Sequence, residues 1–153
     1  MAAPLLEQST EIAATPEKVW SIVSDLSRMG EWSPQCRKVI VRGGTVRLGA
    51  KTINVNKRGL LVWPTTAKVV TFEPNRKIAY RIAENRTVWG FEITPTDSGV
   101  RLTERREAKN GQTTKVSSTL IGLAMGGTES FDAELDEGMR ETLMKIKAAA
   151  ERG

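Results

Sequence analysis

Residues 128–147, TESFDAELDEGMRETLMKIK, predict one long amphipathic helix near the end of the chain. Their apolar positions recur at steps of four, four, four and three, in the order Phe131, Leu135, Met139, Leu143 and Ile146. This spacing places the apolar side chains on one helical face. Thr128 supplies an N-cap hydroxyl, and Lys145 and Lys147 near the far end suit the helix dipole. We therefore expect other parts of the chain to cover one face of this helix.

The region between residues 36 and 107 is typical of strands joined by turns. Apolar side chains recur there at period two, as in Trp89, Phe91 and Ile93. Strands are predicted over residues 36–42, 51–57, 65–72, 77–82, 88–93 and 100–107, and a first strand over residues 6–13. Residues 60–64 are predicted to be an apolar connection, with Pro64 at an edge or turn.

Two short helices are predicted after the first strand. Thr15 and Pro16 have the N-cap hydroxyl and the first-turn proline that begin many helices. Residues 24–25 can cap a second short helix, which Gly30 is expected to end. Because strands and helices are segregated along the chain, the pattern predicts an α+β fold. We expect a curved antiparallel sheet of six or seven strands wrapped around the long helix.

The length of 153 residues favours a single domain, residues 1–153. The chain has one cysteine, Cys36, and no histidine. It therefore lacks the residues for an internal disulfide, a Cys/His zinc site or a Ser-His-Asp triad. We expect no metal site and no cofactor, and we treat Cys36 as a small side chain rather than a nucleophile.

The formal net charge is +5, but the basic residues are spread along the sequence. We therefore do not expect nucleic acid as the partner. No stretch approaches the ~20 apolar residues of a membrane span, and a cytoplasmic protein, monomer or homodimer, is expected. The apolar segments 60–63 and 120–125 leave open a transient contact with a membrane surface.

Four parts of the sequence resemble the START-like, polyketide cyclase/dehydrase and lipid-transport superfamily (SRPBCC). These are residues 15–25, 32–34 and 72–81, together with the terminal helix. The resemblance implies the helix-grip fold that birch-pollen-allergen-like proteins share. It also implies an apolar cavity between sheet and helix that holds a lipid, sterol, polyketide or similar ligand.

Candidate ligand-binding residues follow from the predicted inward positions. They are Trp32, Ile78, Tyr80, Trp89, Phe91, Leu102 and Glu104 before the terminal helix, and Phe131, Leu135 and Met139 within it. The alternative is that the apolar members pack together as a core. Trp32 would then anchor the short helices instead of acting as a lid.

Glu104 follows Val100 and Leu102 at period two, so it is expected to point inward with them. A buried carboxylate needs a partner such as Arg106 or Tyr80, or a raised pKa. A salt bridge near the strand end is the favoured interpretation. If the protein is an enzyme, Glu104, Tyr80 and Arg106 are the catalytic candidates.

Three functions remain open on the sequence alone. The favoured one is binding or transport of a small hydrophobic ligand. The resemblance also allows a polyketide cyclase/dehydratase-like enzyme, although such enzymes often use a histidine that this chain lacks. A third is a protein-interaction module of the chaperone-activator type, which would use an exposed apolar tip around Trp63.

Overall fold

The computed structural model describes residues 5–108 and 128–152, without the side chains of residues 128–131. The elements in chain order are β1 (Leu5–Ile12), α1 (Pro16–Val23), the 3-10 helix η1 (Leu26–Arg28), α2 (Met29–Trp32), β2 (Cys36–Val41), β3 (Lys51–Arg58), β4 (Leu61–Glu73), β5 (Lys77–Ile82), β6 (Val88–Thr96), β7 (Gly99–Glu107) and α4 (Thr128–Glu151). The predicted segment 120–125 and the side chain of Phe131 lie outside the described residues.

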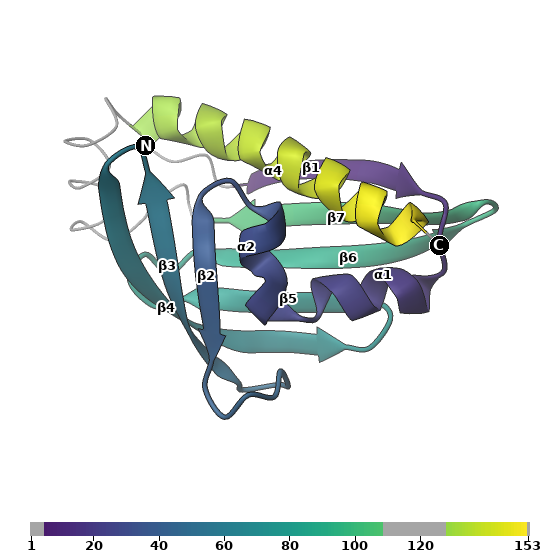
Figure 1. Ribbon diagram of the computed structural model, residues 1–153, viewed down its shortest axis with the longest axis horizontal. Helices are drawn as coiled ribbons and strands as arrows, with labels where there is room; N and C mark the ends of the chain where they lie inside the picture. Colours follow the sequence, from purple (N-terminus) through teal and green to yellow (C-terminus); the bar gives the residue numbers. More distant parts are fainter. Residues whose placement is uncertain (1–4, 109–127, 153) are drawn as a thin grey trace.

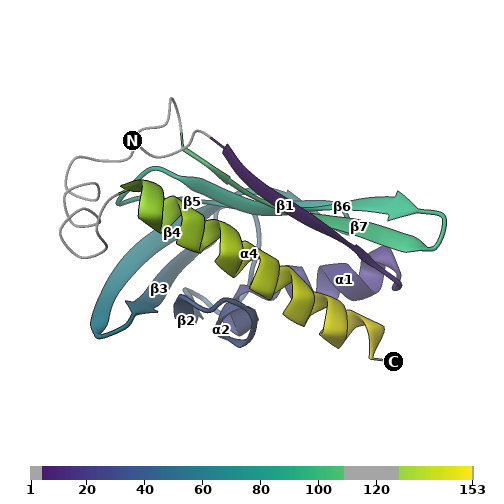
Figure 2. The same ribbon diagram turned by 90° about the horizontal axis from the view of Figure 1, so that it is seen from above.

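The described strands form one antiparallel sheet of seven strands in the order β1-β7-β6-β5-β4-β3-β2. The sheet bends, so that β2 and β3 cross one end of the molecule while β5, β6 and β7 run along it (Figure 1). Seen from above, α4 and the short helices lie on the same side of the sheet (Figure 2). The predicted helix-grip α+β fold is confirmed.

Helix α1 begins as its sequence predicts. The Thr15 hydroxyl accepts a hydrogen bond from the Lys18 backbone N–H at 3.1 Å, and Pro16 occupies the first turn. The helix buries Val19 and Ile22 against the sheet side of the molecule. These caps fix where the chain turns from β1 onto the concave face.

The prediction that Gly30 ends the second short helix is wrong, because α2 continues through it to Trp32. A Cβ atom on Gly30 would lie 2.2 Å from the Arg37 carbonyl oxygen. Glycine is therefore required by close packing of α2 on β2 rather than by a C-cap. Asp25 likewise precedes η1 without a capping hydrogen bond, and its carboxylate instead accepts from the Ser27 hydroxyl at 2.6 Å.

The predicted connection 60–64 is also wrong over most of its length, since β4 begins at Leu61 and includes Pro64. Pro64 pairs with Val55 of β3, whereas the pairing of β4 with β5 starts only at Ala67. Among the described strands, the first half of β4 thus has a neighbour on one side only, which agrees with the edge position predicted for Pro64. A proline is tolerated there because no second ladder of these strands needs its missing N–H.

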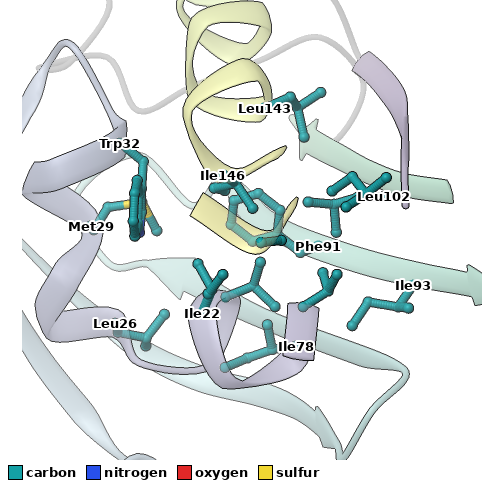
Figure 3. Close-up of a cluster of buried hydrophobic side chains, with 14 of the residues drawn as sticks. Ile22, Leu26, Met29, Trp32, Ile78, Phe91, Ile93, Leu102, Leu143 and Ile146 are labelled. Carbon is teal, nitrogen blue, oxygen red and sulfur yellow. The ribbon is translucent and has the colours of Figure 1, made fainter. Parts of the chain in front are cut away.

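The main core lies between the sheet, the short helices and the second half of α4 (Figure 3). Leu143 and Ile146 of α4 are fully buried in this core, as is Phe91 of β6. A second, smaller cluster surrounds Leu135, one turn before Met139 on α4. It consists of Leu135 with the partly buried Leu6, Leu61, Trp63 and Trp89. The site described below lies where these two clusters adjoin on the sheet.

Candidate functional site

Two neighbouring cross-strand rows of the concave face carry polar residues of β1, β5 and β7. The strand register places the first row in the order Ile78, Phe91, Glu104 and Gln8. The second row follows as Tyr80, Trp89, Arg106 and Leu6. Ile78 and Phe91 belong to the main core, whereas Trp89 and Leu6 belong to the smaller cluster. The boundary between the two clusters therefore runs past Glu104 and Arg106.

Both rows are joined to the first half of α4 by polar contacts. Arg106, buried, forms an ion pair with Asp132 of α4, with Nη1 3.2 Å from Oδ1. One turn further along the helix, Gln8 Nε2 donates to Asp136 Oδ1 at 2.8 Å. These contacts fix how α4 lies over β1 and β7. Neither contact could be predicted from the sequence, because strand and helix periodicities do not determine which positions meet.

Glu104 is buried, with 4% of its surface exposed. Burial raises the pKa of its carboxyl to about 8, so the group is mostly protonated at neutral pH. Its Oε1 accepts no hydrogen bond from the described residues. The favoured expectation of a strand-end salt bridge is wrong, because Arg106 pairs with Asp132 instead. The inward orientation and the alternative of a raised pKa are confirmed.

Tyr80 lies close enough to Glu104 for the two groups to influence each other. Burial of its hydroxyl raises the pKa of Tyr80 well above its ordinary value, and the charges of Glu104 and Cys36 raise it further. The hydroxyl is therefore a neutral hydrogen-bond donor. Cys36 has a pKa raised to about 11 by burial, which agrees with its expected role as an unreactive side chain.

Trp32 is an anchor of the short helices. Its ring is buried in the main core, and the Arg28 guanidinium lies 4.9 Å from the ring centroid (Figure 3). Its indole N–H has no hydrogen-bond partner among the described residues. The expectation that Trp32 closes the site as a lid is not supported by this position.

The remaining predicted ligand-binding residues fall into separate groups. Leu102 is fully buried in the main core with Ile78 and Phe91. Trp89 belongs with Leu135 to the smaller, partly exposed cluster. Met139 is buried on α4, between Leu135 and Leu143 along the helix. The predicted set therefore contains core residues as well as residues of the more open end.

Sequence reasoning missed a row of polar side chains along the inner side of β3. Asn54 and Asn56 both donate to the Thr65 hydroxyl on β4, at 3.2 and 3.0 Å. The Thr52 hydroxyl donates to Asn54 Oδ1 at 2.9 Å. Thr52 and Asn54 are buried, so the row satisfies its own polar atoms. Its signal was present, because these residues alternate at period two within a predicted strand.

The described residues contain no group of three or more His, Cys, Asp or Glu side chains placed to hold a metal ion. The chemistry that these side chains can supply is that of hydrogen bonding and proton transfer. Glu104, when protonated, both donates and accepts a hydrogen bond, and Tyr80 donates one.

Several solved structures have this fold. Cgl2372, a polyketide-cyclase-like protein from Corynebacterium glutamicum, is 28% identical, with a TM-score of 0.65 over 96% of this chain and 91% of that one. The Zhui aromatase/cyclase from Streptomyces sp. R1128 is 18% identical, with a TM-score of 0.75 over 97% and 93%. StfQ, a di-domain ARO/CYC of the steffimycin biosynthetic pathway, is 18% identical, with a TM-score of 0.74 over 97% of this chain and 50% of that one.

No match to the chain was found among curated proteins. The sequence itself matches one family description over residues 4–151, almost its whole length. The curved sheet, the long terminal helix and the order of elements all agree with that match. The chain therefore belongs to the polyketide cyclase/dehydrase and lipid transport family.

Proposed function

We propose that this protein binds a small hydrophobic molecule with one polar end, of the polyketide or lipid type, against the smaller cluster and Glu104. The observation that carries the proposal is the Glu104 carboxyl. It is buried, and its Oε1 has no hydrogen-bond partner among the described residues. Buried polar atoms are nearly always paired, and the exceptions mark water, ligand or catalytic positions.

The apolar part of the ligand would rest on the smaller cluster. Trp63 and Trp89 are only partly buried there, beside Leu135 of α4. Aromatic rings offer large apolar surfaces, and binding sites are typically apolar with few polar groups. Covering such surface contributes about 25 cal/mol per Å². The main core, by contrast, consists of side chains that are buried in the structure.

The polar end of the ligand would meet the Glu104 carboxyl. A protonated carboxyl donates to a carbonyl oxygen and accepts from a hydroxyl, both of which polyketides and fatty acids carry. Tyr80 supplies a second neutral donor nearby. Because Glu104 is mostly neutral below its pKa of about 8, an uncharged ligand end is favoured.

Binding is tested with Nile red, an uncharged apolar dye, and by native mass spectrometry of protein purified from its own host. We expect saturable dye binding and a co-purifying lipophilic mass. Trp89→Leu should weaken dye binding at least about fivefold, or about 1 kcal/mol. Leu48→Ala is the control, since Leu48 is 65% exposed and belongs to neither cluster. Absence of both dye binding and a bound mass would contradict the proposal.

A second candidate is a cyclase/dehydratase-like enzyme, favoured by the raised pKa of Glu104 beside Tyr80. Glu104 would donate its proton to a carbonyl oxygen of a bound polyketide while an enol carbon of the same polyketide attacks that carbonyl carbon. The enol oxygen becomes a carbonyl and releases its proton, which would restore the Glu104 carboxyl. Glu104→Gln would then abolish turnover of a poly-β-ketone substrate and change its affinity by less than about tenfold. Equal losses of affinity and turnover would assign Glu104 to binding alone.

The interaction-module hypothesis would use the apolar tip around Trp63. The Trp63 ring is partly buried against Leu135 in the smaller cluster, whereas Leu60 and Val62 beside it are exposed. This hypothesis stays a prediction.

A further inference from the structure

The stretch from Trp32 to Phe72 contains no acidic residue. It contains eight basic ones, Arg37, Lys38, Arg42, Arg47, Lys51, Lys57, Arg58 and Lys68. Since the whole chain carries a formal charge of +5, the rest of it is net acidic. The stretch folds mainly into β2, β3 and all of β4 but its last residue, and β2, β3 and the first part of β4 form one end of the molecule (Figure 1). The expectation that positive charge is spread without a focus is therefore wrong for this end.

The outward side of these three strands has an apolar centre. Ile40 of β2 is opposite Ile53 of β3, and both are exposed. The neighbouring outward position, Val55, is opposite Pro64 of β4. Beyond it, Val62 is exposed, and Leu60 in the β3–β4 turn is 100% exposed.

Lysines surround this centre. The four outward-facing ones are Lys38, Lys51, Lys57 and Lys68. None of them forms an ion pair with an acidic side chain of the described residues. We name this surface, lysines and apolar centre together, the β2–β4 outer face.

Two of these lysines repel each other. Lys51 and Lys68 are directly opposite across β3 and β4, where like charges are unfavourable. The acid at the border of the face, Glu84, is held by the Thr66 N–H and hydroxyl, each at 2.7 Å. An anionic partner would therefore compensate charge that the fold itself leaves uncompensated.

We propose that the β2–β4 outer face docks on an anionic lipid bilayer. Exposed aliphatic side chains between lysines suit the boundary between acyl chains and phosphate groups. Single-stranded nucleic acid would favour aromatic side chains on this face. Here the aromatic residues of β4 point inward, because Trp63 packs with Leu135 and Phe72 with Trp20. Within the described residues no helix is long and apolar enough to cross a bilayer, so the contact is peripheral.

The test is co-sedimentation of the full chain with vesicles of phosphatidylcholine alone or with about 30 mol% phosphatidylglycerol. We expect binding to the anionic vesicles only, falling as salt rises. Lys51→Glu with Lys68→Glu should lower the partition coefficient at least about tenfold. Lys18→Glu with Lys145→Glu changes the net charge equally at exposed positions outside the face and should have little effect. Leu60→Ser should weaken binding without altering its salt dependence.

Other outcomes overturn the proposal. An equal loss of vesicle binding in the Lys51/Lys68 variant and the Lys18/Lys145 variant would indicate that binding depends only on net charge. Binding to single- or double-stranded DNA that the Lys51/Lys68 variant alone abolishes, without vesicle binding, would assign the face to nucleic acid. Circular dichroism shows whether each variant is folded. Nile red binding reports the interior site separately, so failure here leaves the proposed ligand binding intact.

Discussion

Glu104 illustrates how burial sets the chemistry of a single residue. Its pKa in the folded protein is about 8, against an ordinary value of 4.5. Between these values the folded state holds a proton that the unfolded state has released. The free energy of unfolding therefore falls as pH rises through this window and levels off above it.

We predict that Glu104→Gln removes this pH dependence. In the parent protein, Glu104 lowers the free energy of unfolding by up to about 1.4 kcal/mol for each unit that the pH rises between pH 4.5 and about 8. Urea unfolding at about pH 5 and about pH 8 measures the change in the free energy of unfolding for the parent protein and for the variant. If the difference between the two pH values is the same in the variant, then Glu104 does not have a raised pKa.

Two glycines with different surroundings offer a matched pair of substitutions. Gly30→Ala would place a Cβ 2.2 Å from the Arg37 carbonyl oxygen. The backbone of α2 or β2 would have to move to relieve this contact. We expect a loss of roughly 3 kcal/mol or more in the free energy of unfolding.

Gly138→Ala would meet only the Pro34 ring, at 3.3 Å, within a helix that gains about 1 kcal/mol from alanine. Its stability should change little. Chemical denaturation of both variants checks the pair, and an equal effect at the two positions would contradict the packing described for α2.

At the scale of elements, local signals were reliable where one residue determines the outcome. Thr15 and Pro16 predicted the start of α1 correctly. Gly30 misled, because its role depends on the β2 backbone, which is distant in sequence. Pro64 lies at an edge position as predicted, but it does not interrupt β4, because the pairing with β5 begins only at Ala67. A glycine or proline in the sequence therefore does not by itself show whether a helix or strand ends there or whether another part of the backbone packs closely against it.

The candidate site was predictable to a similar degree. Period-two alternation placed Glu104 inward correctly, because the pleat of a strand fixes which side a residue faces. The partner of Arg106 was not predictable. Asp132 meets Arg106 only through the packing of α4 across β7, and such contacts leave no trace in either periodicity.

The buried Arg106–Asp132 ion pair should be important for how α4 seats on the sheet. We predict that Asp132→Ala lowers the free energy of unfolding by about 3 kcal/mol, because it leaves a buried guanidinium without this carboxylate. Arg140→Ala breaks the exposed pair with Asp136 and should cost less than about 1 kcal/mol. Comparable losses in urea unfolding would show that burial does not strengthen the Arg106 contact.

At the scale of the whole molecule, the two apolar clusters differ in how deeply they are buried. The main core consists of buried side chains and holds the short helices, the sheet and the second half of α4 together (Figure 3). The smaller cluster at the first half of α4 is only partly buried. We therefore expect the main core to determine stability and the smaller cluster to determine ligand binding.

Substitutions on α4 test this division. Leu143→Ala removes a side chain buried in the main core and should cost about 2–5 kcal/mol in stability while leaving Nile red affinity unchanged. Leu135→Ala should lower stability less than Leu143→Ala does, and it should weaken Nile red binding at least about threefold. Thermal unfolding and dye titration measure the two effects, and the reverse assignment would refute the division.

Within residues 5–108 and 128–152 the sheet does not close, so β1 and β2 are its two edge strands. At β1, Lys147 donates to the Glu11 carbonyl oxygen at 2.7 Å and Glu151 accepts from the Ala13 N–H at 2.8 Å. At β2, an irregularity between Cys36 and Lys38 interrupts the ladder. Both devices hinder strand addition by another chain. The fold thus keeps an open sheet while discouraging amyloid-like growth from either margin.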